Sequence, residues 1–353
     1  KYEMTFDGNG HRFSNDTGVN RETNTGWTLL RVYQNSGEVI IKNLDLYTKG
    51  SYSRSLGIAQ ATDTTIVNIV DCNISNGTHY PIVLAGSCNG VKVNIYNTTL
   101  NQNEDDITGY CAIYSHAIDA KISIKNATLF GDNKNSGDTN AFSTIVIDSG
   151  SHTDILMEDS IIKSACVDLE FAPEYAILYK NGTSGTVIFG ENVRLISEFN
   201  DAEVTPLFKA DNSDGYASVS LNGDMVGTIS IGQDKLTIAG QDGNDFSDGF
   251  IVTGYGYDTL DVTISGINST GAGIFVSGAG NVTIDDCTVS NVGQESVCYG
   301  GNVFGIGVRD ADSVIITGCD INNVESTKRG VSGSVGKDGI GIFLDQIKEK
   351  VII

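Results

Sequence analysis

The chain has 353 residues, of which 40% are hydrophobic and 19% are charged, and its formal net charge is −22. Such a charge argues against nucleic acid and anionic membrane surfaces as partners, because both would be repelled. No apolar run is long enough to span a bilayer, so we expect no direct membrane insertion. With 42 Gly and only 3 Pro, the composition favours short strands joined by many turns.

One short phrase recurs along the chain: two apolar residues separated by one residue, then a turn residue at the fifth position. In chain order its instances are MTFDG (4–8), VIIKN (39–43), VNIVD (67–71), VNIYN (93–97), ISIKN (122–126), ILMED (155–159), VIFGE (187–191), VSLNG (219–223), VTISG (262–266), VTIDD (282–286) and VIITG (314–318). The intervals between them are irregular but bounded. This spacing is typical of a coil with variable loops, whereas a helical-pair repeat would have a fixed period.

The fifth position of the phrase predicts a tight corner between two strands. It is Gly, Asn or Asp in every instance except Glu191, and these residues tolerate a left-handed backbone. Near Glu191 we expect the next strand to be slipped by one residue, with a bulge. The predicted corner ladder consists of Asn43, Asp71, Asn97, Asn126, Asp159 and Asp286.

A further apolar run precedes each phrase, for example PIVLA (81–85) and AIYSH (112–116), so each coil has three short strands. The expected fold is all-β: a right-handed, single-stranded parallel β-helix of about ten to eleven coils. The pattern resembles the pectate-lyase-like superfamily of this fold, in which the corner often carries stacked Asn, as at Asn43, Asn97 and Asn126. In character the chain is closest to the non-catalytic surface and adhesin-type members.

We expect residues 1–353 to form a single β-helix domain that is an excerpt of a longer solenoid. The chain opens inside a coil, and Val351-x-Ile353 resembles the start of another phrase. No amphipathic capping helix is evident at either end, and uncapped sheet ends favour self-association. Contact between copies through the coil ends is therefore one predicted mode of assembly.

In enzymes that resemble this pattern, the active site lies on the outer face of the first strand of each coil. The predicted outward residues, here called the outer stripe, are mostly apolar: Ala59, Val83, Tyr114, Val146, Leu178, Phe208, Val252, Phe275, Gly307 and Gly341. Covering loops or a partner would explain such a stripe. Self-association through the outer stripe is a second predicted mode of assembly.

The next outward position holds the main catalytic candidates. His116, Asp148 and Lys180 fall on three successive coils, about 4.8 Å apart at the backbone, with Tyr114 beside them. Such a row can transfer protons, or it can be an ion-pair ladder without catalysis. Arg309 occupies this position on another coil, with Ser277 and Phe343 as its predicted neighbours. Of the sequence motifs of the family's polygalacturonases and epimerases, only Asp105-Asp106 resembles one, which favours a non-enzyme.

Other residues suggest metal binding, glycosylation or disulfides. The segment QDGNDFSDG (241–249) offers oxygen ligands for calcium from Asp242, Asn244, Asp245 and Asp248, or it is a polar loop. We expect no other cofactor. Seven Cys form no zinc motif; some are disulfide candidates, and others are small buried residues. Glycosylation sequons occur at Asn15, Asn73, Asn76, Asn97, Asn126, Asn181, Asn268 and Asn281.

Three functions agree with these patterns. The first is an extracellular or cell-surface structural or adhesive β-helix without catalytic activity, such as a stalk, adhesin or fibre segment that binds glycan or itself. The second is a polysaccharide lyase or glycoside hydrolase that uses the row of His116, Asp148 and Lys180. The third is a homotrimeric, tailspike-like glycan binder.

Overall fold

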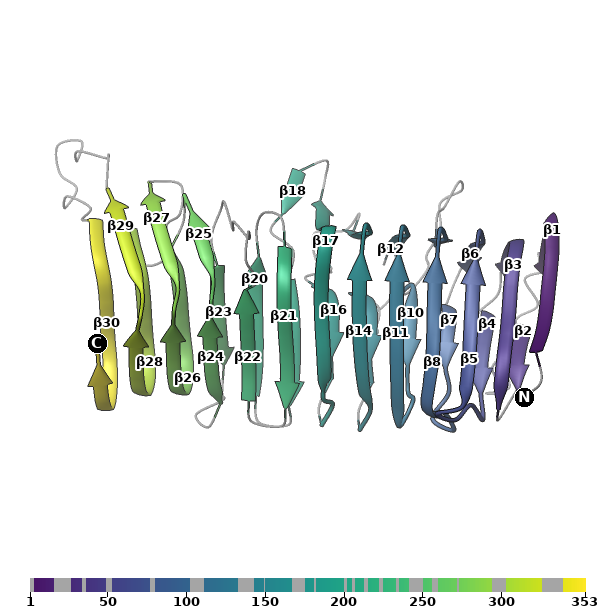
Figure 1. Ribbon diagram of the computed structural model, residues 1–353, viewed down its shortest axis with the longest axis horizontal. Coiled ribbons are helices and arrows are strands. Elements are labelled where there is room, and N and C mark those ends of the chain that lie inside the picture. Colours follow the sequence, from purple (N-terminus) through teal and green to yellow (C-terminus); the bar gives the residue numbers. More distant parts are fainter. Residues whose placement is uncertain are drawn as a thin grey trace. The chain divides into compact units, whose positions relative to one another are not determined.

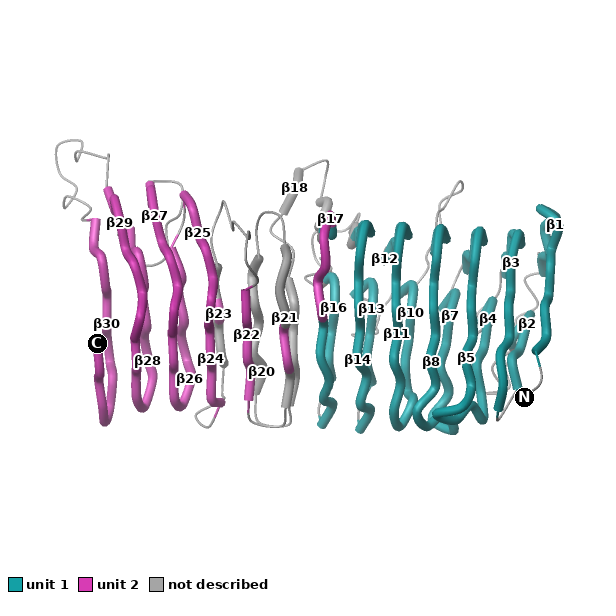
Figure 2. The backbone as a smooth tube through the Cα atoms, viewed as in Figure 1, with its two compact units in different colours: residues 1–187, 193–206 teal, residues 188–192, 207–353 magenta. Residues whose placement is uncertain are grey.

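The structure of the protein is a computed structural model, and the chain divides into two compact units (Figure 2). Unit 1 comprises residues 1–187 and 193–206, and unit 2 comprises residues 188–192 and 207–353. The residues that the structure describes are 3–15, 27–33, 36–48, 53–76, 80–101, 111–132, 143–148, 150–166, 175–180, 182–199, 202–204, 207–212, 215–221, 225–232, 235–240, 250–255, 260–271, 273–293, 303–325 and 339–353.

Unit 1 is a parallel β-solenoid whose strands stack in three ladders (Figure 1). The first ladder contains β2 (Trp27–Tyr33), β4 (Ser53–Ala59), β7 (Tyr80–Leu84), β10 (Ile113–Ser115), β13 (Ser143–Ile147) and β16 (Tyr175–Tyr179). The second contains β1 (Glu3–Asn15), β3 (Gly37–Thr48), β5 (Thr65–Val70), β8 (Asn89–Tyr96), β11 (Asp119–Lys125) and β14 (His152–Glu158). The third contains the end of β3, β6 (Asn73–Asn76), β9 (Thr99–Leu100), β12 (Thr128–Asp132), β15 (Ile161–Cys166) and the end of β17 (Gly185–Phe199).

Unit 2 contains parallel ladders as well. One runs through β22 (Lys235–Gly240), β24 (Asp261–Ser265), β26 (Ile274–Asp285), β28 (Val303–Thr317) and β30 (Gly339–Ile352). A second, three-stranded sheet consists of β25 (Asn268–Thr270), β27 (Thr288–Val292) and β29 (Asp320–Val324). The described residues contain no helix.

The predicted all-β parallel solenoid is therefore confirmed, with three strands in each regular coil of unit 1. The number of turns is about seven, fewer than the ten to eleven predicted. One reason is a set of antiparallel pairs where the repeat predicted a parallel coil around VSLNG. β20 (Gly215–Leu221) pairs antiparallel with β19 (Leu207–Asn212) and β23 (Phe250–Tyr255). Further antiparallel pairs join β21 (Met225–Gly232) to β22, and β17 to β18 (Ala202–Val204).

The core of unit 1 is built from the apolar positions of the repeated phrase. Val67, Val93, Ile122 and Ile155 occupy one register position on successive coils, and each is almost fully buried. Within each strand, the residues that alternate with the buried ones face outward. In β5 this gives an alternation of buried and half-buried side chains. Each buried aliphatic side chain contributes about 1.5–3 kcal/mol by leaving water. Stacking thus buries faces that a single coil would leave exposed.

The backbone is left-handed at most of the predicted corners that the structure describes, whereas at MTFDG (4–8) the left-handed residues are Asn9 and Gly10, directly after Gly8. Positive φ values occur at all six predicted ladder residues, Asn43, Asp71, Asn97, Asn126, Asp159 and Asp286, and also at Gly266 and Gly318. Near Glu191 the left-handed residue is Asn192, with φ 57°, so the corner is displaced by one residue. Asn192 accounts for this displacement, because Asn adopts the left-handed conformation at a lower cost than Glu.

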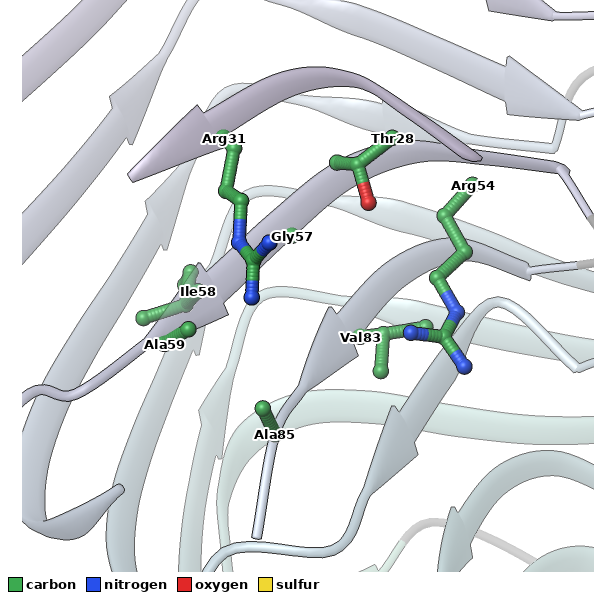
Figure 3. A pocket seen from close by; sticks show the side chains of 8 residues that line it. All are labelled: Thr28, Arg31, Arg54, Gly57, Ile58, Ala59, Val83 and Ala85. Carbon is green, nitrogen blue, oxygen red and sulfur yellow. The ribbon is translucent and has the colours of Figure 1, made fainter. Parts of the chain in front are cut away.

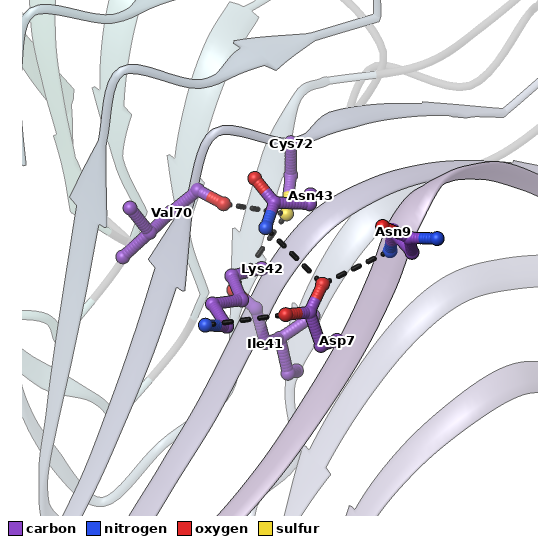
Figure 4. Close-up of polar contacts among 7 residues, drawn as sticks. All are labelled: Asp7, Asn9, Ile41, Lys42, Asn43, Val70 and Cys72. Atoms are coloured by element: carbon purple, nitrogen blue, oxygen red, sulfur yellow. Dashed lines mark hydrogen bonds and ion pairs between the residues drawn. The ribbon is translucent and has the colours of Figure 1, made fainter.

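Side-chain amides connect these corners from one coil to the next. Asn43 Nδ2 donates to Asp7 Oδ1 over 3.1 Å, and Lys42 pairs with the same carboxylate (Figure 4). Asn97 Nδ2 donates to Asp71 Oδ1, and Asn126 Nδ2 donates to Asn97 Oδ1 over 3.1 Å. In unit 2, Asn323 Nδ2 donates to Asn291 Oδ1 over 2.9 Å. The corner residues therefore serve architecture.

Candidate polar site on the outer face of unit 1

His116, Asp148 and Lys180 each follow the last residue of a first-ladder strand. The preceding residues, Ser115, Ile147 and Tyr179, are in register on β10, β13 and β16. Backbone hydrogen bonds continue the ladder past the strand ends: Asp148 N donates to Ser115 O over 2.8 Å, and Lys180 N donates to Ile147 O over 2.9 Å. The structure therefore places the three side chains on neighbouring coils.

Asp148 lies between the two basic residues and contacts both. His116 Nδ1 is 2.6 Å from Asp148 Oδ2, and Lys180 Nζ is 3.4 Å from Asp148 Oδ1. The side chains of Asp148 and Lys180 are each 19% exposed, whereas that of His116 is 39% exposed. The imidazole is thus the most accessible part of this group, and the carboxylate is held behind it.

The ring of Tyr114 packs against the row formed by His116, Asp148 and Lys180. Its ring packs edge-on against His116, with centroids 4.5 Å apart, and Lys180 Nζ lies 5.8 Å from its centroid. Tyr114 also stacks on Tyr80 at 4.4 Å. Because Tyr114 is buried, its ring positions the charged side chains and offers little surface to a sugar.

The middle of the outer stripe is buried within the chain. Val83, Tyr114, Val146 and Leu178 are in register and form a cluster with Tyr80 and Cys111. All six side chains are buried, so this part of the stripe offers little surface to a second copy.

Burial lowers the pKa of His116 below its ordinary value. The positive charges of Arg54 and Lys180 lower the pKa further, and together these effects outweigh the opposing influence of Asp148. The imidazole is therefore neutral at neutral pH. With Nδ1 facing a carboxylate, the proton resides on Nδ1 and the lone pair on Nε2. This is the form of histidine that can accept a proton.

Two arginines that the sequence analysis did not single out lie next to this row. Arg31 on β2 and Arg54 on β4 line a pocket of about 70 Å³, together with Thr28, Gly57, Ile58, Ala59, Val83 and Ala85 (Figure 3). Ala85 adjoins His116, since His116 N donates to Leu84 O and the His116 carbonyl oxygen lies 3.5 Å from a Cβ built on Gly86. The pocket and the charged row are thus neighbouring parts of one face.

The predicted register of the outer stripe is wrong at three places. Gly57, not Ala59, pairs with Val83; Ile251, not Val252, pairs with Phe275; and Phe343, not Gly341, pairs with Gly307. The runs GIAQA (57–61) and GIGIF (339–343) fit two registers that differ by two residues, because they alternate small and apolar residues.

The last of these shifts changes the surroundings of Arg309. Its register neighbours are Ser277 and Asp345, not Phe343. Arg309 Nε lies 3.4 Å from Asp345 Oδ2 and 3.3 Å from Asp310 Oδ2. Arg309 is therefore part of an ion-pair group in unit 2.

The sequons differ in their accessibility. Asn76 is buried and its Nδ2 donates to the Tyr80 carbonyl, so this amide is inaccessible in the folded coil. Asn97 and Asn126 are exposed members of the corner ladder, and Asn281 Nδ2 donates to Asp261. Asn268 is exposed, Asn15 and Asn73 are half-buried, and Asn181 lies outside the described residues.

The predicted calcium ligands Asp242, Asn244, Asp245 and Asp248 also lie outside the described residues. Within the described ranges, no group of three or more His, Cys, Asp or Glu side chains is arranged to hold a metal ion. Cys72, Cys88, Cys287 and Cys319 carry free thiols, with no disulfide between them. Burial raises the pKa of Cys287 to about 12, in keeping with a small core residue.

Comparisons with known proteins add no assignment: no protein-family model, curated protein or solved structure matches this chain. The part of the chain that the structure describes contains no helix long and apolar enough to cross a membrane.

Proposed function

We propose that this chain is an extracellular structural or adhesive solenoid that holds glycan on the outer face of unit 1 without cleaving it. The observation that supports this most is the size of the pocket on that face, about 70 Å³. Pockets that enclose a small-molecule ligand usually measure about 300–1,000 Å³. A polysaccharide can rest against so shallow a surface, but the pocket is too small to enclose a sugar ring and exclude water from it.

The construction of unit 1 agrees with a supporting role. Its buried columns and amide-linked corners repeat with little change from coil to coil, which suits a rigid spacer. Exposed sequons such as Asn268 fit a glycosylated surface protein. The resemblance to surface and adhesin-type members of the pectate-lyase-like superfamily points the same way.

The test is to measure binding and cleavage in one experiment. The full chain is incubated with xylan, dextran and oligogalacturonate; retention is measured by affinity electrophoresis, and cleavage by new reducing ends and by absorbance of unsaturated sugars. We expect retention of at least one glycan and no product. Product formation above that of heat-denatured protein would contradict the non-catalytic role.

A second candidate function is a proton-transferring polysaccharide lyase or hydrolase. The observation that favours it is the 2.6 Å contact of His116 Nδ1 with Asp148, combined with a lowered imidazole pKa. In a lyase, His116 Nε2 would remove the proton next to a uronate carboxylate. The electron pair would form a carbon–carbon double bond as the glycosidic C–O bond breaks, and the departing oxygen would take up a proton.

Matched histidine variants test this second candidate. His116→Gln removes the base, whereas His152→Gln removes an exposed histidine of the same unit that hydrogen-bonds Ser184. If cleavage is detected, we expect His116→Gln to reduce it at least 100-fold and His152→Gln to leave it unchanged. Equal activity in both variants would exclude His116 as the base.

A further inference from the structure

The pocket next to His116 has two arginines on one side of the first ladder. Arg31 pairs in register with Gly57, and Arg54 pairs with Tyr80 on the next coil. Figure 3 shows both guanidinium groups lying on the same side of the sheet, above Gly57 and Val83. The floor between them is formed by small or short side chains, so the space above it is open.

Gly57 keeps this floor open. A Cβ at this position would lie 2.8 Å from Thr28 Cγ2, too close for the present arrangement. Any larger residue would therefore have to displace Thr28 or fill the space between the arginines. The absence of a side chain at this register position is what makes the pocket.

The two positive charges lack a carboxylate partner among the described residues. No ion pair among the described residues includes either arginine, and the buried Nε of Arg54 has no hydrogen-bond acceptor there. Burial lowers the pKa of Arg54, and the like charge of Arg31 adds to this effect. A half-buried, uncompensated guanidinium is costly to the fold, and an anion in the pocket would relieve that cost.

We propose that Arg31 and Arg54 form a subsite for one oxyanion group, a carboxylate or a sulfate ester, carried by the glycan. The proposal rests on the glycan-binding function proposed above and names the class of glycan. Guanidinium groups match the planar or tetrahedral oxygens of such groups with paired N–H donors. The pocket is small, about 70 Å³, which suits a single charged group.

The net charge of −22 opposes polyanions at long range. At physiological ionic strength, however, exposed charges more than about 8 Å away are largely screened. The charges that line the pocket are those of Arg31 and Arg54, while Asp148 in the neighbouring row is engaged with His116 and Lys180. The subsite therefore acts at contact distance, and it should be tested near 0.15 M salt.

The experiment compares three probes on the full chain: oligogalacturonate for carboxylates, dextran sulfate for sulfate esters, and neutral dextran. Arg31→Gln and Arg54→Gln are each expected to weaken binding of an anionic probe about tenfold, and the double variant at least 50-fold. Arg12→Gln is the matched control, because it removes the same charge from an exposed arginine of unit 1 that pairs with Asp45. We expect Arg12→Gln to change affinity less than twofold.

Ala85→Glu provides a second test that keeps both arginines. It places a carboxylate at the edge of the pocket, where it should occupy the subsite. We expect the melting temperature to rise and binding of the anionic probe to be lost. A melting temperature that falls, with anionic binding intact, would overturn the proposal even if the arginine variants fail to fold.

The outcomes separate the subsite from the function on which it rests. Binding of neutral dextran as tight as that of both anionic probes, or an equal loss in Arg12→Gln, would overturn the subsite and leave glycan binding standing. Retention of none of these polysaccharides would count against the proposed function. In that case, a rise in melting temperature with inorganic sulfate that disappears in Arg31→Gln supports the subsite, and no rise overturns it.

Discussion

Each unit has a row of polar and charged side chains at one register position on three successive coils. The order of acidic and basic residues differs between the two rows. In unit 1 the row is His116, Asp148 and Lys180, with a carboxylate between two basic groups. In unit 2 the register-matched row is Ser277, Arg309 and Asp345, with a guanidinium in the middle. Both rows form ion pairs, because stacked parallel strands bring side chains about 4.8 Å apart. The central residue decides which chemistry is available.

Of the two rows, only the one in unit 1 contains an imidazole. His116 lies beside a pocket and burial lowers its pKa, whereas Arg309 contacts two carboxylates. A charged row on a solenoid is therefore no evidence of function by itself. It becomes a candidate site when a titratable side chain and an open space lie next to each other.

Removing the central carboxylate should have the largest effect. Asp148→Ala leaves Lys180 without one of its partners and His116 without its hydrogen-bond acceptor in a partly buried place. We expect a loss of about 2–3 kcal/mol in the free energy of unfolding, measured by chemical denaturation. A loss below about 0.5 kcal/mol would mean that the row in unit 1 is as weakly coupled as an exposed surface pair.

Substitutions at the corners should change the free energy of unfolding by an intermediate amount. Unit 1 has Asn at a corner where unit 2 has Gly: Asn126 and Gly266 both have positive φ. Asn126→Ala should cost about 1–2 kcal/mol, because Ala is strained in this conformation and the bond to Asn97 is lost. Asn126→Gly should cost less than Asn126→Ala. Both variants lose the bond to Asn97, so equal costs would show that the amide bond, and not the backbone conformation, determines the effect.

Lowering the pH should have a smaller effect on the free energy of unfolding, and this effect should be specific to His116 in unit 1. The pKa of His116 in the folded chain is below its ordinary value of 6.5, so unfolding takes up a proton once the pH falls below that value. The stabilising contribution of neutral His116 is therefore complete above about pH 6.5 and is lost as the pH falls through the lowered pKa. Denaturation midpoints of wild type and His116→Gln, compared at pH 7.5, 6.0 and 5.0, should differ in slope. Parallel profiles would contradict this linkage.

The smallest effect is expected in the row of unit 2. Asp345 is 39% exposed, and its replacement by Ala leaves Arg309 in contact with Asp310. We expect Asp345→Ala to cost less than about 1 kcal/mol in the free energy of unfolding, and the loss to shrink further in 1 M NaCl. A cost equal to that of Asp148→Ala would remove the distinction between the rows.

The periodic features of this molecule could be predicted from the sequence, because a fold that repeats a corner repeats its backbone requirement. Asn126 and Asp286 are examples, and even the displaced corner near Glu191 left a signal in the following Asn. The spacing of His116 and Asp148 followed from the same register. The antiparallel pairing of β20 did not, since its phrase VSLNG alternates like that of a parallel strand.

The pocket lined by Arg31 and Arg54 could not be predicted from the sequence, for a different reason. Arg31 and Arg54 sit at different positions within their strands, so aligning the repeats does not bring them together. They share a pocket because Gly57 has no side chain at the register position between β2 and β7. A glycine that acts through its missing side chain leaves no periodic signal in the sequence.

The corner amides have a direction. Asn43, Asn97 and Asn126 each donate to the coil that precedes them in the chain, and Asn323 does the same in unit 2. During synthesis on the ribosome the acceptor therefore exists before its donor is made. Each new coil meets a finished template as it emerges, so that folding can keep pace with translation instead of waiting for the last residue.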